Sequence, residues 1–307
     1  MKLSAVDNSN TPIFNDMEYM FNNCTNLESL DLTGFDTTST TNMKGLFNGC
    51  NSLEDLKLFL DTSSVTDFSY MFKDCCSLTS LDLTTFDKIT QNNDMGYMLY
   101  NCNHLVSLDL SKLDTSKTTN MESMFYGCSS MPSFDVSNFK TSQVTNMKKM
   151  FSNCNSLTSL ELLNFNTHQV ENMASMFSDC YDLKYLKINK FDTSSVTKMD
   201  SMFTNCSALL SLDLSTLETP KVNSMSKMFQ NCKSLIIIDI SSFDTSLVTD
   251  MSYMFSNCSS LEYLDMKNFI ENENLNDSYM FDRSEEIHVH ILGKNSNLNI
   301  FLLKIFV

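Results

Sequence analysis

Eleven cysteines are the residues of this sequence with the most chemical options, because thiols form disulfides, bind metals or act as nucleophiles. Ten of them recur at a nearly fixed interval, and from Cys102 onward every step is 26 residues. Only Cys76 lies outside the series, and no CxxC pair occurs. The spacing predicts an interior column of reduced thiols that pack as small apolar groups. Disulfides between adjacent repeats are the alternative, although parallel side-chain directions disfavour them. The column is Cys24, Cys50, Cys75, Cys102, Cys128, Cys154, Cys180, Cys206, Cys232 and Cys258.

Other catalytic or metal-binding patterns are weak. His288 and His290 alternate onto one face of a predicted last strand, but two ligands without a third do not make a zinc site. With six glycines in the whole chain, no loop is suited to cradle a phosphate. Ser and Asp are so frequent that apparent triads arise by chance. We therefore predict no metal site, no cofactor and no enzymatic activity.

Carboxylates form a second regular series, interrupted by Lys57 and Lys187, on what should be the exposed side of a strand. Carboxylates stacked about 4.8 Å apart should repel one another, which would raise their pKa values, and they could bind a divalent cation weakly. Two residues earlier, Ser gives way to Tyr and Ile in the C-terminal half, and exposed Tyr beside acids is typical of contact surfaces. A solvated surface without a partner is the alternative. The predicted interaction face is Asp82, Asp109, Asp135, Glu161, Tyr185, Asp213, Ile237, Asp239, Tyr263 and Asp265.

Both series belong to one repeating unit, whose consensus is close to residues 144–162, VTNMKKMFSNCNSLTSLEL. Met147, Met150, Phe151 and Cys154 fall at i, i+3, i+4 and i+7, a spacing that predicts a short amphipathic helix. The leucines that follow at L-x-x-L-x-L spacing predict a short half-buried strand. Elements of this size cannot bury their apolar faces alone, so the repeat predicts coils stacked into a solenoid.

Local signals place the ends of the predicted helix. Thr or Asn two residues before the first Met should act as its N-cap. Asn, Gly or Asp immediately before each Cys should adopt the left-handed conformation that closes it. We expect three segments: a lead-in or cap over residues 1–16, the repeat solenoid over 17–281, and a C-terminal cap strand and apolar tail over 282–307. A partner-binding or interfacial tail is the alternative.

Charge narrows the choice of partners. The net charge is −16, from 37 acidic and 21 basic residues, and no basic patch is evident, so a nucleic-acid partner is excluded and an anionic membrane surface is disfavoured. No apolar run reaches the roughly 18 residues that a membrane span requires. The start, MKLSAVDNSN, lacks the apolar core of a signal peptide, which favours an intracellular protein-binding or self-associating scaffold.

The units FDTSxVTNMxxMFxxCxSLxSLDLS resemble the 26-residue repeat of the DUF285 or BspA-like leucine-rich-repeat family of bacterial surface proteins and mycoplasmal lipoproteins, over residues 17–280. The resemblance implies an α/β, leucine-rich-repeat-like solenoid of about ten coils, each a short parallel strand plus a short helix. It also implies a non-catalytic, adhesin-like protein at the cell surface or outside the cell, with a protein or cell-surface ligand as its partner. The missing signal peptide leaves a cytoplasmic location open.

Overall fold

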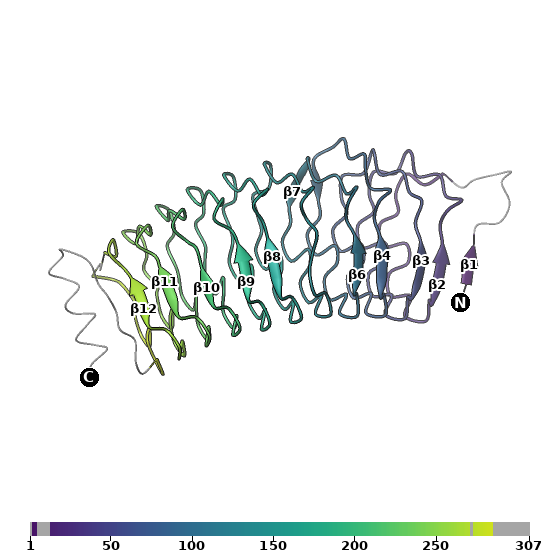
Figure 1. Cartoon of the computed structure of the whole chain (residues 1–307). Coiled ribbons are helices and arrows are strands. Elements are labelled where there is room, and N and C mark those ends of the chain that lie inside the picture. The colour runs from purple at the N-terminus through teal and green to yellow at the C-terminus, as the bar shows by residue number, and fades with distance from the viewer. Residues whose placement is uncertain (1, 5–12, 271–272, 285–307) are drawn as a thin grey trace. The chain divides into compact units, whose positions relative to one another are not determined.

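The chain winds through successive coils in the computed structural model, which describes residues 2–4, 13–270 and 273–284. It divides into two compact units, Met1–Leu157 and Thr158–Val307, called here the first and the second unit. Within each unit, most coils carry one short strand that lies beside the strand of a neighbouring coil, and the paired strands run parallel (Figure 1). The architecture is a β-solenoid of about nine turns.

The strands pair in a register that superposes equivalent residues of the repeat, for example Leu81 on Leu108 and Ile238 on Leu264. The central residue of a strand points inward and its two neighbours point outward, as predicted. In the first unit the strands are β1 (Lys2–Ser4), β2 (Ser29–Asp31), β3 (Asp55–Lys57), β4 (Ser80–Asp82) and β6 (Ser107–Asp109), with β5 (Asn93–Asp94) pairing separately with β7 (Thr118–Asn120). In the second they are β8 (Ser159–Glu161), β9 (Tyr185–Lys187), β10 (Ser211–Leu212), β11 (Ile237–Asp239) and β12 (Tyr263–Asp265).

The predicted helix in each coil is wrong, because the described residues contain no helix of any length, and hence none able to cross a membrane. Tandem turns take its place. The N–H groups of Met202 and Cys206 donate to carbonyls three residues back, at 3.2 and 3.1 Å. The alternate N–H groups, those of Ser201, Phe203 and Asn205, donate instead to carbonyls of the next coil, at 2.9, 2.9 and 2.8 Å. The backbone therefore alternates between closing its own turn and bonding to its neighbour.

Two residues in each pair of turns are left-handed, for example Ser201 with φ 56° and Asn205 with φ 63°. The prediction of a left-handed residue just before each Cys is confirmed. The left-handed residue four positions earlier was not predicted, because Tyr, Ser or Lys occupies it in every described coil except the one that carries Gly45. The predicted N-cap is also wrong: Asn172, directly before the Met, accepts the N–H of Ala174 at 3.0 Å, whereas the hydroxyl of Thr197 donates to the carbonyl of Glu171 in the previous coil at 3.1 Å.

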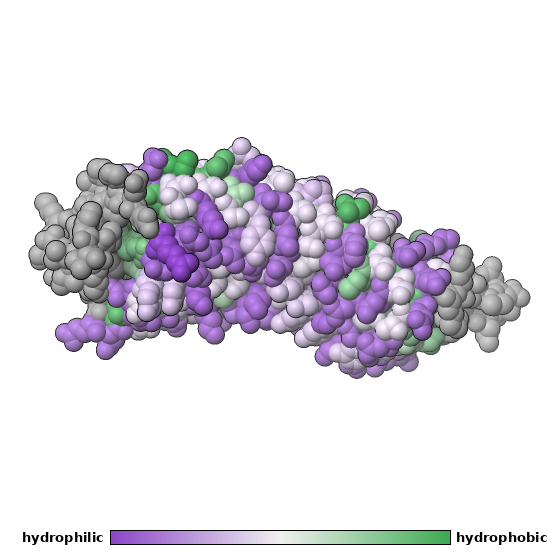
Figure 2. Space-filling model, turned by 90° about the horizontal axis from the view of Figure 1, so that it is seen from below, coloured by the Kyte–Doolittle hydropathy of each residue, from purple (hydrophilic) through white to green (hydrophobic). Residues whose placement is uncertain are grey.

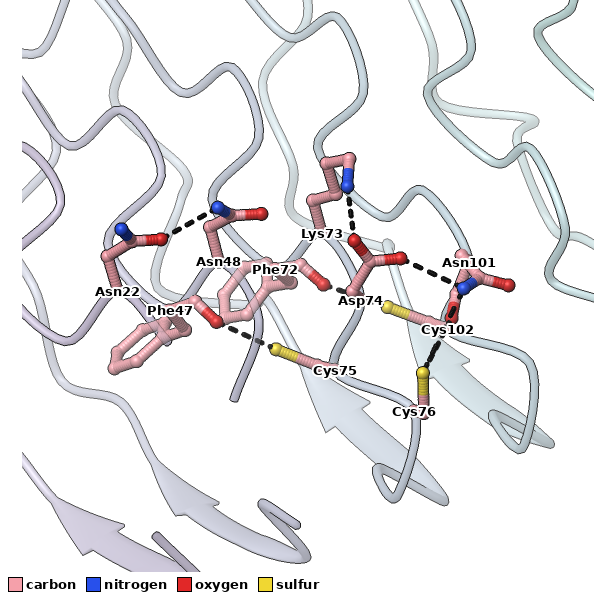
Figure 3. A network of polar contacts seen from close by, with 10 residues as sticks. All are labelled: Asn22, Phe47, Asn48, Phe72, Lys73, Asp74, Cys75, Cys76, Asn101 and Cys102. Atoms are coloured by element: carbon pink, nitrogen blue, oxygen red, sulfur yellow. Dashed lines mark hydrogen bonds and ion pairs between the residues drawn. The ribbon is translucent and has the colours of Figure 1, made fainter. Parts of the chain in front are cut away.

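The interior follows the predicted columns of Met, Phe and Cys. Phe203, Phe229 and Phe255 are fully buried and stacked, with ring centroids 5.4 and 5.3 Å apart. The eleven cysteines, all within the described residues, form no disulfide, as predicted, and nine are buried. Seven of them also donate from Sγ to the backbone carbonyl of the Phe in the previous coil, as Cys75 does to Phe47 at 3.2 Å (Figure 3), and Cys128 donates to that of Leu99.

The thiol column continues one coil further than its cysteines. Ser284 stands 26 residues after Cys258, and its hydroxyl donates to the carbonyl of Phe255 at 2.8 Å, the bond that a thiol makes elsewhere. The position thus requires a small donor that can reach an inward carbonyl, and Cys provides one with little cost of burial.

Thiol reactivity should follow burial. Burial raises the pKa of Cys128 to about 12, so almost no thiolate exists there at neutral pH. Cys24 and Cys76 are partly exposed, and we expect iodoacetamide to modify them first in the folded chain. Peptide mass spectrometry over a time course measures this, with the denatured chain as the control for intrinsic reactivity. Equal rates at Cys76 and Cys128, or disulfide-linked peptides, would contradict the buried column.

Candidate functional site

The predicted interaction face lies on the outer side of the strands, called here the outer strand face. In the first unit Asp82 of β4 stands directly opposite Asp109 of β6, and both are exposed. Asp135 is exposed in the following coil, close enough to Asp109 for their charges to interact. The structure therefore brings these three carboxylates together as a stripe.

In the second unit the outer strand face mixes acids with large side chains. Tyr185 on β9 is 63% exposed and Ile237 on β11 is 53% exposed, and Ile237 stands directly opposite Tyr263 of β12. Glu161 on β8 pairs with Lys187 on β9 at 2.5 Å. Asp213 and Asp239 are exposed, whereas Asp265 is only 9% exposed. Nine of the ten predicted residues thus reach solvent.

The aspartates of this series also close the turns that follow the strands, a role that their spacing did not predict. Each carboxylate accepts the N–H of the residue two positions on, closing the turn that follows the strand, as Asp109 does with Ser111 at 2.9 Å. Glu is too long to close this turn in the same way, which explains the preference for Asp. Equivalent bonds join Asp31 to Thr33, Asp82 to Thr84, Asp135 to Ser137, Asp213 to Ser215, Asp239 to Ser241 and Asp265 to Lys267.

These hydrogen bonds outweigh charge repulsion, so the expected rise in pKa is wrong. The side-chain and backbone bonds from Ser111 lower the pKa of Asp109, and those from Ser137 lower the pKa of Asp135. Repulsion from Asp109 does act on Asp135, but it is the smallest of the four contributions. Carboxylates that accept hydrogen bonds in the folded state prefer to stay ionised.

Acid should therefore weaken the fold at these turns. A carboxyl group whose pKa is lowered by folding contributes stability above its unfolded pKa, near 3.9 for Asp, and this contribution is lost as the pH falls through the folded value. We expect the free energy of unfolding to fall below about pH 4. The triple variant Asp109→Asn/Asp135→Asn/Asp213→Asn keeps an acceptor in each turn without a titrating group, so its loss should be shallower. Urea unfolding at a series of pH values measures both. A wild type that gains stability in acid, or equal slopes for the two chains, would refute this assignment.

The stripe offers no preformed cation site. Across residues 13–270 and 273–284, no three or more His, Cys, Asp and Glu side chains are placed to hold a metal ion together. The weak divalent binding predicted from the stripe therefore has no cluster to support it. His288 and His290 lie outside the described residues, as does most of the predicted C-terminal cap and tail.

Sequence reasoning missed two groups of exposed residues. Leu210 and Ile236 are 42% and 39% exposed at equivalent positions just before β10 and β11. Figure 2 shows one face of the molecule, which is largely hydrophilic with a few separate hydrophobic patches. The signal for Leu210 and Ile236 was available, because Thr79 and Thr158 occupy the same position in other coils. The second group is a stack of partly exposed tyrosines in the first unit, Tyr70 on Tyr97 and Tyr100 on Tyr126.

A family model described as "Mycoplasma protein of unknown function, DUF285" matches residues 15–133, 93–209 and 181–295. No curated protein matches this chain. Among solved structures, a leucine-rich repeat protein from Bacteroides ovatus is 16% identical with a TM-score of 0.46, over 89% of this chain and 80% of that one. One from Eubacterium ventriosum is 15% identical with a TM-score of 0.44, over 91% and 83%. Since the overlapping matches of the family model extend from residue 15 to residue 295, this repeat protein belongs to the DUF285 family.

Proposed function

We propose that the chain is a non-catalytic, adhesin-like scaffold at the cell surface, and that it binds a protein partner through the outer strand face of the second unit. The observation that carries the proposal is the exposure of large side chains there: Tyr185 at 63%, Ile237 at 53%, and Tyr263 directly opposite Ile237. Exposed Tyr and aliphatic residues grouped on a regular face are characteristic of binding surfaces.

The fold does not need these side chains. The equivalent strand position holds Ser in five other coils: Ser29, Ser80, Ser107, Ser159 and Ser211. Serine therefore satisfies the strand geometry, and an exposed Ile or Tyr adds apolar surface that the strand does not require. Binding of a partner would bury this apolar area and give it a stabilising role.

The surrounding chemistry favours binding over catalysis. Asp213 and Asp239 flank the apolar group, and each commits one carboxylate oxygen to its own turn. An acidic border of this kind complements a partner with a basic rim. The cell-surface location rests on the resemblance of the repeats to bacterial surface proteins and mycoplasmal lipoproteins.

Affinity capture tests the proposal with three immobilised chains: the wild type, Tyr185→Ser/Ile237→Ser/Tyr263→Ser, and Leu247→Ser/Ile270→Ser. The last pair is exposed by 57% and 47% in turns of the same unit, away from the strands, so it matches the loss of apolar surface. Each chain is exposed separately to solubilised surface proteins and to cytosolic proteins, and the Kd of any captured partner is then measured.

The proposal predicts a surface-protein partner whose Kd rises at least tenfold, about 1.4 kcal/mol, for the triple variant and stays unchanged for the control. A partner that binds the triple variant as tightly as the wild type would refute the outer strand face as the contact. A partner found only among cytosolic proteins would favour an intracellular scaffold, and self-association of the chain would favour a structural one.

A further inference from the structure

The first unit contains a pocket of about 520 Å³, which is lined by turns that follow its strands. Three turns of successive coils form its walls, residues 35–38, 59–62 and 84–88. Its volume lies within the range of sites that hold small molecules or anchoring side chains of partners. The pocket is lined only by residues of the first unit and shares none with the outer strand face of the second unit.

The middle wall departs from the repeat in three linked ways. The turn after β3 is one residue shorter than its counterparts, so Lys57-Leu58-Phe59-Leu60 stands where the next coil has Asp82-Leu83-Thr84-Thr85-Phe86. The strand Asp that closes this turn elsewhere is replaced by Lys57. Phe59 takes the place of a polar pair and is 68% exposed. An exposed Phe in a turn that polar residues fill elsewhere indicates a contact with something outside the chain.

The third wall lacks the regular threonine bridge to the second. In a regular pair of coils, the turn Thr bridges to the next coil, as Thr167 does by donating to the carbonyl of Asp192 at 2.9 Å and accepting its N–H at 2.8 Å. Thr62 holds the same position but is 2% exposed with a hydroxyl that has no partner in the described chain. Lys88 stands where the next Thr should be, and the coil that carries it has an extra residue in this loop. The bridge between these two turns lies further along the chain, where the hydroxyl of Thr90 donates to the carbonyl of Ser63 at 2.6 Å, and the pocket occupies the space beside the unbridged Thr62.

The pocket is acidic, and several of its carboxylate oxygens accept no hydrogen bond within the described residues. Its lining carries Asp36, Asp61 and Asp87 against Lys88, three negative charges and one positive, or −2 in total. Asp36 and Asp61 each use Oδ1 to close a turn, with Thr38 and Ser63. Within the described residues, their Oδ2 atoms and the whole Asp87 carboxylate accept no hydrogen bond or ion pair.

We propose that this pocket binds an arginine side chain of a protein partner. The guanidinium group offers five N–H donors in a plane, which suits the free oxygens of Asp61 and Asp87 and the exposed ring of Phe59. The apolar stem can pack on Phe35 and Leu60. The inference shares with the proposed function only the idea of a protein partner, since its site lies in the other unit.

Methyl NMR of the full chain, labelled at Leu and Thr, tests the site with N-acetyl-arginine methylamide as the probe. Saturable shifts are expected at the methyl groups of Leu60 and Thr62, with a Kd in the millimolar range, on the order of 1 mM for a ligand of this size. Phe59→Ser and Asp61→Asn should each weaken binding by roughly threefold to thirtyfold. Phe59 is exposed, so its replacement by the polar residue type of other coils should leave the coil folded, and unchanged methyl shifts in the second unit verify this.

The matched control is Asp244→Asn in the second unit. Asp244 closes an equivalent turn by accepting the N–H of Ser246 at 2.9 Å, the same distance as between Asp61 and Ser63, and its loss changes the net charge equally. If the control weakens binding as much as Asp61→Asn, or if the shifts do not saturate, general attraction to an acidic protein explains the result and the proposal falls. The uncharged citrulline analogue, the lysine analogue or a neutral sugar binding as well as the arginine probe would also overturn it. The variant Tyr185→Ser/Ile237→Ser/Tyr263→Ser should bind the probe normally, so either proposal can fail alone.

Discussion

Replacing Phe229 with alanine is expected to lower the free energy of unfolding by about 3–5 kcal/mol. Its ring is fully buried and packed on both sides, with centroids 5.4 Å from Phe203 and 5.3 Å from Phe255. The same column recurs in the neighbouring coils, so the cavity cannot collapse without moving them. Guanidinium unfolding followed by tyrosine fluorescence measures the loss.

Lys233→Ala is the matched control, because Lys233 is exposed in the same coil and should change stability by no more than about 0.5 kcal/mol. If Phe229→Ala costs no more than this control, the inward column of aromatic rings is not the main source of stability in the second unit.

Ser201→Gly is expected to stabilise the chain by up to about 1 kcal/mol, and Ser201→Val to destabilise it by about 1–2 kcal/mol or more. Ser201 has φ 56°, a conformation that glycine adopts freely and a β-branched residue adopts with strain. In an α-helix the sign for glycine would be reversed, with a cost near 0.5 kcal/mol relative to serine.

The control for this second pair is Lys233→Gly, at a position without positive φ, where glycine should bring only its ordinary entropic cost of about 0.5–1 kcal/mol. Thermal melts of the four chains give the comparison. A destabilising Ser201→Gly would indicate a right-handed backbone at this site and refute the tandem turns.

The apolar columns could be predicted from the sequence because burial is periodic in both a helix and a chain of tandem turns. Met199, Met202, Phe203 and Cys206 are all buried, as their spacing indicates. The backbone could not be predicted in the same way, because the partner of the Phe203 N–H is the carbonyl of Met228 in the next coil. Local periodicity carries no information about bonds to residues so distant in sequence.

The interaction face, too, could be predicted only in part from the sequence. Alternation along the strands correctly indicated which residues point outward, including Tyr185 and Ile237. A Ser or Thr stands two residues after most of these aspartates, which is typical of a turn-closing Asp. The prediction considered only the charges of the series and therefore missed this role. The pocket at Phe59 required the structure, since only the stacking of coils brings a shortened turn and a lengthened loop together.

Each coil is held by turns bonded to the next coil, which leaves the outer strand face as its regular exposed surface. Scalar couplings across hydrogen bonds, measured by NMR on the isotope-labelled chain, identify the acceptor of a given N–H directly. For Phe203 we predict a coupling to the carbonyl carbon of Met228, whose oxygen lies 2.9 Å from the Phe203 nitrogen. A coupling to the carbonyl of Met199, four residues back, would demonstrate an α-helix and contradict the tandem turns bonded to the next coil.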